Sequence, residues 1–212
     1  MGDTSMKTAN LCLIFLLQLS FSFPSFADGS GMKAYQAGDY LKALSIWEPE
    51  AIQGNATAQF NIGYMHEFGE GVTQSHEIAA KWYELAADQG DARAQHSLGN
   101  FYFSSGSYAA ATNWYKQSAE QGVAEAQADL GASYGLGQGV PQSYIYAHMW
   151  SNISSLTGFD KGVRLTAELE EFMSPTEISI AQYLARDCIK KNFKGCDTYP
   201  AYRTLLAMSH GS

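Results

Sequence analysis

The chain has 212 residues and a net charge of −8, and its acidic excess falls almost entirely before residue 159. Residues 28–158 include 13 acidic and 5 basic side chains, whereas residues 159–212 include 7 of each. A surface of this sign repels phosphate backbones, so the composition predicts no nucleic-acid partner.

The first predicted element is a secretion signal over residues 1–27. Lys7 gives it a positive start, an apolar run extends from Leu11 to Leu19, and Ser25-Phe26-Ala27 places small residues where signal peptidase cleaves. The apolar run is far shorter than the roughly 20 residues that span a bilayer. We expect cleavage after Ala27, no stable membrane insertion of the mature protein, and a periplasmic or secreted location.

A repeated pattern follows the signal. The dipeptide Gln-Gly recurs at 53–54, 89–90 and 121–122, and Thr157-Gly158 continues the series, so the glycines are 36, 32 and 36 residues apart. The pattern Ala-x-Ala-Gln-x-x-[Ile/Leu]-Gly follows each of the first three glycines, with its apolar residues at helical spacing. These features predict stacked helical hairpins within residues 28–158. The approximate units are 32–53, which is incomplete, then 54–89, 90–121 and 122–157.

The unit lengths differ in the connection between the two helices. The 36-residue units carry Gly69-Glu70-Gly71-Val72 and Gly137-Gln138-Gly139-Val140, whereas the 32-residue unit has only Ser104-Ser105-Gly106-Ser107. The longer connections do not match the phosphate-binding pattern G-x-G-x-x-G, so we interpret them as structural turns. The sequence predicts no cofactor.

The repeat pattern fades after Gly158, but apolar residues at helical spacing continue. Ser174-Pro175-Thr176-Glu177 is typical of a helix start with a capping box. Residues 159–192 are therefore expected to form a helical cap, and residues 193–212 a tail. Cys188 and Cys196 are the two cysteines beyond the signal, and oxidising conditions after export favour a disulfide between them.

The repeated units resemble Sel-one-like repeats of the tetratricopeptide-like superfamily, of the exported bacterial type. The resemblance rests on the Ala-x-Ala-Gln helix, the Gly-x-Gly-Val loop and the Trp-Tyr pairs at 82–83 and 114–115, and it covers roughly residues 38–158. It implies an all-α fold, a right-handed α/α superhelix (solenoid) of stacked helix-turn-helix repeats with a C-terminal helical cap.

The residues indicate a non-catalytic protein. Ser30-Gly31-Met32-Lys33 matches the serine–lysine motif of penicillin-recognising enzymes, but their other motifs are missing. The five histidines have no spacing typical of metal ligands. They are His66, His76, His96, His148 and His210. The alternatives are a cell-envelope hydrolase, or a peptidoglycan- or β-lactam-binding protein like cysteine-rich members of the family, and a structural subunit that self-associates.

The first helix of each unit lines the inner face of such an array, so positions that vary between units are candidates for binding. In the first two full units they carry the aromatic and polar side chains that protein interfaces favour. The predicted partner-binding residues are Phe60, Tyr64, Glu67, Arg93, His96, Asn100 and Phe103. The third unit offers Glu125, Ala128, Ala132 and Gly135 there. Packing between repeats is the alternative role. We expect a protein or peptide ligand in this concave groove, bound by an interaction scaffold.

Overall fold

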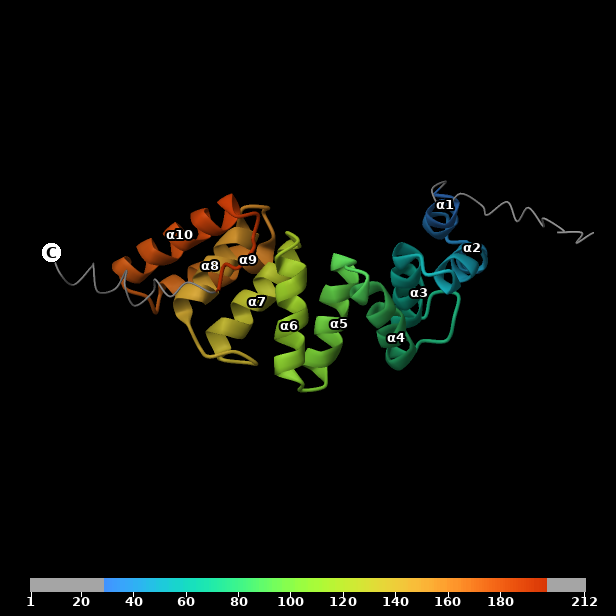
Figure 1. Ribbon diagram of the computed structural model, residues 1–212, viewed down its shortest axis with the longest axis horizontal. Coiled ribbons are helices and arrows are strands. Elements are labelled where there is room, and N and C mark those ends of the chain that lie inside the picture. Colours follow the sequence, from blue (N-terminus) through green and yellow to red (C-terminus); the bar gives the residue numbers. More distant parts are fainter. Residues whose placement is uncertain (1–28, 198–212) are drawn as a thin grey trace, which may run out of the picture.

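The computed structural model describes residues 29–197 (Figure 1). The predicted signal at 1–27, its cleavage site and most of the predicted tail lie outside the described residues. The described part of the chain forms ten α-helices and no strand. The helices are α1 (Ser30–Gln36), α2 (Tyr40–Ile52), α3 (Ala56–Phe68), α4 (His76–Asp88), α5 (Ala92–Ser104), α6 (Tyr108–Ala119), α7 (Ala124–Leu136), α8 (Tyr144–Ser155), α9 (Asp160–Glu170) and α10 (Pro175–Lys190).

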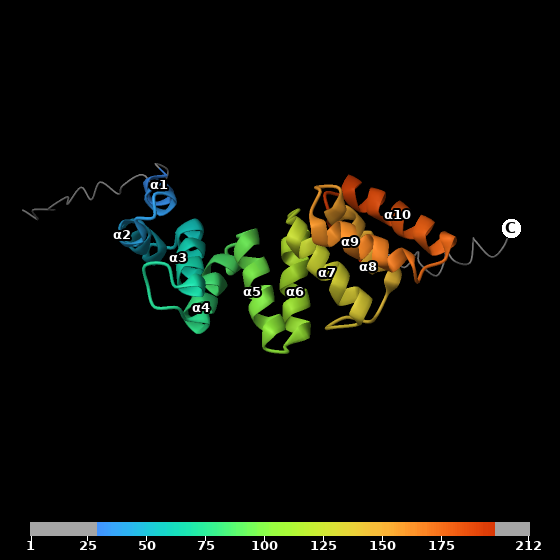
Figure 2. The same cartoon turned by 180° about the vertical axis from the view of Figure 1, so that it is seen from behind.

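The helices stack in chain order into an elongated array, with α1 at one end and α10 at the other (Figures 1 and 2). From α1 to α9 each helix packs on the one before it, and α3/α4, α5/α6 and α7/α8 form the three full hairpins. At the C-terminal end α9 also packs on α7, and α10 packs on α8. The predicted all-α solenoid of helix-turn-helix repeats is therefore confirmed, while its right-handed sense stays a prediction.

The Gln-Gly dipeptides mark the ends of the second helices. Gly54 and Gly90 have φ angles of 92° and 90°, a left-handed conformation that glycine adopts without steric cost. The next residue then caps the following helix, because the side chains of Asn55 and Asp91 accept hydrogen bonds from backbone N–H groups in the first turns of α3 and α5. Two adjacent residues thus end one repeat and begin the next.

The repeated glutamine joins each full unit to the one before it. The buried amides of Gln59, Gln95 and Gln127 donate hydrogen bonds of 3.0, 3.2 and 3.2 Å to backbone carbonyls near the ends of α2, α4 and α6. These carbonyls lie at a helix C-terminus, where the backbone leaves acceptors without a partner inside the helix. Each carbonyl also accepts a backbone hydrogen bond from Gly54, Gly90 or Gly122, so the glutamine adds a second hydrogen bond that joins the two units.

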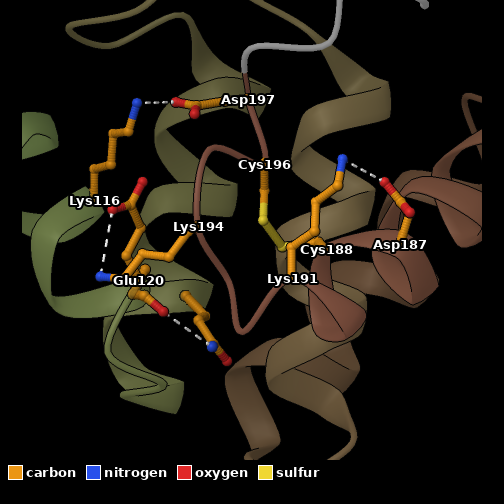
Figure 3. The surroundings of a disulfide bond; sticks show 10 residues. Lys116, Glu120, Asp187, Cys188, Lys191, Lys194, Cys196 and Asp197 are labelled. Carbon is orange, nitrogen blue, oxygen red and sulfur yellow. Dashed lines mark hydrogen bonds and ion pairs between the residues drawn. A yellow bond between two sulfur atoms is a disulfide. The ribbon is translucent and has the colours of Figure 1, made fainter.

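A C-terminal clasp, residues 191–197, connects the cap to the repeats (Figure 3). Helix α10 ends at Lys190, the chain turns, and a disulfide joins Cys188 to Cys196, whose Cα atoms are 5.2 Å apart. Asp197 accepts a 2.9 Å hydrogen bond from the hydroxyl of Tyr134 on α7 and forms a 2.9 Å ion pair with Lys116 on α6. The clasp therefore holds the end of α10 near the third repeat.

We expect Cys188→Ser to loosen the clasp without unfolding the array. A bridge that closes so short a loop contributes about 2–3 kcal/mol of chain entropy in the loop-closure model. Hydrogen–deuterium exchange should show faster exchange in residues 187–197, and unchanged protection in α3–α5. Cys196→Ser should give the same pattern, and a loss of protection in α3–α5 would contradict a local role for the bridge.

Candidate partner-binding site

The structure divides the predicted binding residues among several places. Phe60, Tyr64 and Arg93 lie together at the N-terminal end of the array, where they line a pocket of ≈ 160 Å³ with side chains of α1 and α2. The guanidinium carbon of Arg93 lies 4.2 Å from the centre of the Phe60 ring, a cation–π contact, and Arg93 also pairs with Asp91 at 2.7 Å. The N-terminal pocket is therefore an aromatic site with a fixed cation at its edge.

Glu67 and Asn100 lie together in a larger cavity of ≈ 480 Å³ between α3, α4 and α5, which we call the polar cavity. The hydroxyl of Tyr83 donates a 2.5 Å hydrogen bond to the Glu67 carboxylate, and burial together with this bond raises the pKa of Tyr83. The phenol therefore remains a donor at neutral pH and holds Glu67 in place. Asn100 accepts a 2.8 Å bond from the hydroxyl of Tyr115.

His96 takes the alternative role of packing between repeats. Its Nε2 lies 2.7 Å from a carboxylate oxygen of Asp129 on α7, and Asp129 also pairs with Lys161 on α9. Burial acts to raise the pKa of Asp129, but the hydrogen bonds and charges of His96 and Lys161 outweigh it and lower that pKa. This network ties α5, α7 and α9 together, so His96 is engaged within the array.

Phe103 and the third unit also depart from a uniform groove. The ring of Phe103 contacts Tyr108 at a centroid distance of 5.2 Å while keeping 37% of its surface exposed. Ala128, expected on the open face, is fully buried because α9 packs against α7 and covers this part of the third repeat. The open first-helix surface therefore belongs mainly to α3 and α5.

Sequence reasoning missed the side chains that the second helix supplies to the polar cavity. His76, Ala79, Ala80 and Tyr83 all come from α4 and line the cavity. The sequence pattern predicts binding positions on the first helices alone, whereas the cavity lies between a hairpin and the first helix of the next unit. The signal for it was the shorter connection of the following unit.

Within residues 29–197 the structure shows neither a candidate metal site nor a candidate membrane-spanning helix. No group of three or more His, Cys, Asp or Glu side chains lies close enough to hold a metal ion. No described helix combines the length and the apolar composition that crossing a bilayer requires.

Comparison with known proteins identifies relatives of the repeats. The Sel1 repeat family model matches residues 56–91, 92–123 and 124–155. Over 64 residues the chain is 42% identical to protein sel-1 homolog 2 of Mus musculus. This alignment covers 30% of this chain and 9% of that protein. Over 75 residues it is 35% identical to the ERAD-associated E3 ubiquitin-protein ligase component HRD3 of Candida glabrata. This alignment covers 32% of this chain and 9% of that protein. The aligned region thus spans about a tenth of each relative.

A solved structure is similar over a larger share of the chain. The crystal structure of a Sel1 repeat protein from Oxalobacter formigenes superposes with a TM-score of 0.54 at 28% sequence identity. The match covers 59% of this chain and 97% of that one. The helical hairpins of the two proteins therefore stack in a similar way.

Proposed function

Since this chain belongs to the family of Sel1 repeat proteins, we propose that it is a non-catalytic scaffold that binds another protein or a peptide. The similarity to a component of an E3 ubiquitin-protein ligase supports a role in an assembly. The repeated sequence features also support a scaffold role, because they stack helices.

The observation that carries the proposal is the set of partly exposed aromatic rings on α3 and α5. Tyr64 is 37% exposed, Phe68 is 54% exposed and Phe103 is 37% exposed. They lie on the helices that also supply Arg93 and Asn100, and protein interfaces favour such a mixture of large rings and polar tips. This surface is where we place the partner.

We further propose that the scaffold works in the periplasm or outside the cell. The signal-like segment at 1–27 supports export. The Cys188–Cys196 disulfide supports it as well, because such bonds persist in oxidising compartments and are rare in reducing ones.

Site-specific photo-crosslinking in cells tests the proposed function. A photoreactive amino acid at Tyr64 or Phe103 should crosslink to a second protein, which mass spectrometry then identifies. The same residue at Leu85, half exposed on α4 outside the cavity and the N-terminal pocket, serves as the control and should give no such product. Crosslinks from Leu85 alone, or from none of these sites, would contradict the proposal.

A further inference from the structure

The Gly-x-Gly-Val loops pack on the preceding repeat. A Cβ atom added to Gly71 would lie 2.7 Å from Cβ of Tyr40, and one added to Gly139 would lie 2.2 Å from the carbonyl oxygen of Tyr108. Tyr40 and Tyr108 are the first residues of α2 and α6, each the second helix of the preceding unit. Each long connection therefore covers the start of the second helix before it.

The start of α4 has no such cover. Its first residue, His76, has the repeat position of Tyr40 and Tyr108. The following unit joins α5 to α6 through residues 105–107 alone, a connection too short to reach back over α4. The polar cavity lies at this place, lined by His76, Ala79 and Ala80. The polar cavity therefore lies where a longer connection in the following unit would cover the start of α4.

A similar cavity recurs two units later. The connection from α9 to α10, residues 171–174, also lacks a Gly-x-Gly-Val loop, and the start of α8 faces a cavity of ≈ 380 Å³, which we call the apolar cavity. Gly135, Tyr144, Leu165, Glu168, Leu169 and Phe172 line it. Each of them lies 68 positions, the sum of one long and one short repeat, after a residue that lines the polar cavity. The repeat architecture thus builds both cavities in one register.

The equivalent positions carry different chemistry. Glu67, Ser97 and Ser104 of the polar cavity correspond to Gly135, Leu165 and Phe172 of the apolar cavity. The exchange at Asn100 runs the other way, because Glu168 lines the apolar cavity, but Glu168 is exposed whereas Glu67 is partly buried. The lining of the polar cavity includes the Glu67 carboxylate and no Lys or Arg, within an array whose charges are mainly negative. A carboxylate in a partly enclosed site pairs well with a cation, and the rings of Tyr83 and Phe101 are further contacts for one.

We propose that the two cavities are subsites for one partner segment, with a Lys or Arg side chain in the polar cavity and a large apolar side chain in the apolar cavity. The inference rests on the proposed scaffold function and specifies the chemistry of its partner. Glu67, positioned by the Tyr83 hydroxyl, pairs with the cation, and Leu165, Leu169 and Phe172 receive the apolar side chain. The spacing of the repeats sets the distance between the two cavities, and therefore between the basic and the apolar side chain of the partner.

Selection of random peptides displayed on phage against the purified protein tests this inference. Selected peptides should be enriched in Lys or Arg and in large apolar residues. For a representative peptide, Glu67→Gln should weaken binding about tenfold, as loss of a charge-assisted contact does. It should leave unchanged the binding of an analogue whose basic residue is replaced by Gln. Glu84→Gln, at an exposed acidic residue of α4 outside the cavity, is the matched control and should leave both affinities unchanged.

The apolar cavity is tested with the same peptide. Phe172→Ser should weaken its binding about tenfold, while Leu156→Ser, at a similarly exposed apolar residue outside the cavity, should not. Selection of no peptides, or of peptides without basic residues, would overturn the inference, and so would full affinity in Glu67→Gln. Peptides whose binding depends on Phe60 and Arg93 instead would overturn it while leaving the proposed scaffold function intact.

Discussion

Gly139→Ala is expected to lower the free energy of unfolding by about 3 kcal/mol. Gly139 has a φ of 77°, where a residue with a Cβ atom loses roughly 1–2 kcal/mol. The new methyl group would also meet the backbone of Tyr108 at 2.2 Å, and forcing the loop away from α6 adds an overpacking cost of about 1–3 kcal/mol. Urea denaturation followed by circular dichroism measures the loss.

Gly90→Ala is the matched control for the loop contact. Gly90 has a φ of 90°, but no heavy atom lies within 4 Å of the position of its added Cβ atom. This variant therefore carries the conformational cost alone, about 1–2 kcal/mol. Equal losses in the two variants would contradict the packing of the Gly-x-Gly-Val loop on the preceding repeat.

Trp150→Ala is expected to have the largest effect on stability, about 3–5 kcal/mol, as for other large aromatic residues removed from a core. Trp150 is fully buried in the cluster that α8 shares with the C-terminal cap. Trp114 has the equivalent position one repeat earlier and is only partly buried. Trp114→Ala should therefore lower the free energy of unfolding by at most about half as much in the same denaturation experiment.

The difference between the two tryptophan variants also measures how much the C-terminal cap adds to the stability of the core around Trp150. The greater burial of Trp150 comes with the packing of α10 on α8, which the repeats alone do not provide. Similar losses in Trp150→Ala and Trp114→Ala would mean that the cap contributes little to the core beneath it.

Much of the fold could be predicted because each repeat signal has a local physical cause. The Gln-Gly dipeptides end helices through the left-handed conformation of Gly54 and Gly90, and the capping box of Ser174 and Glu177 begins α10 at Pro175. Such causes act within one or two helical turns, so the sequence displays them directly. The stacking then follows from the apolar stripe that a single hairpin leaves uncovered.

The binding site was harder to predict because it depends on contacts one repeat apart. His96 was expected on an open groove, yet Asp129 on the next first helix engages it. Asp129 is in turn paired with Lys161, which lies beyond the recognisable repeats. The polar cavity likewise results from a loop that one unit lacks, and its walls come from both that unit and the one before it, α5 on one side and α3 and α4 on the other. An inspection of each helix by itself finds neither feature.

A loop graft tests the central claim, that the short connection between α5 and α6 opens a partner site. Residues 105–107 are replaced by the seven-residue connection at 69–75, so that a Gly-x-Gly-Val loop can cover the start of α4. A flexible Gly-Ser connection of the same length serves as the control. The measurement is the affinity for the selected basic peptide by fluorescence anisotropy, with melting followed in parallel. We predict at least a tenfold loss for the graft, an unchanged affinity for the control and no loss of melting temperature in the graft. Full affinity in a graft that melts like the native protein would contradict the account.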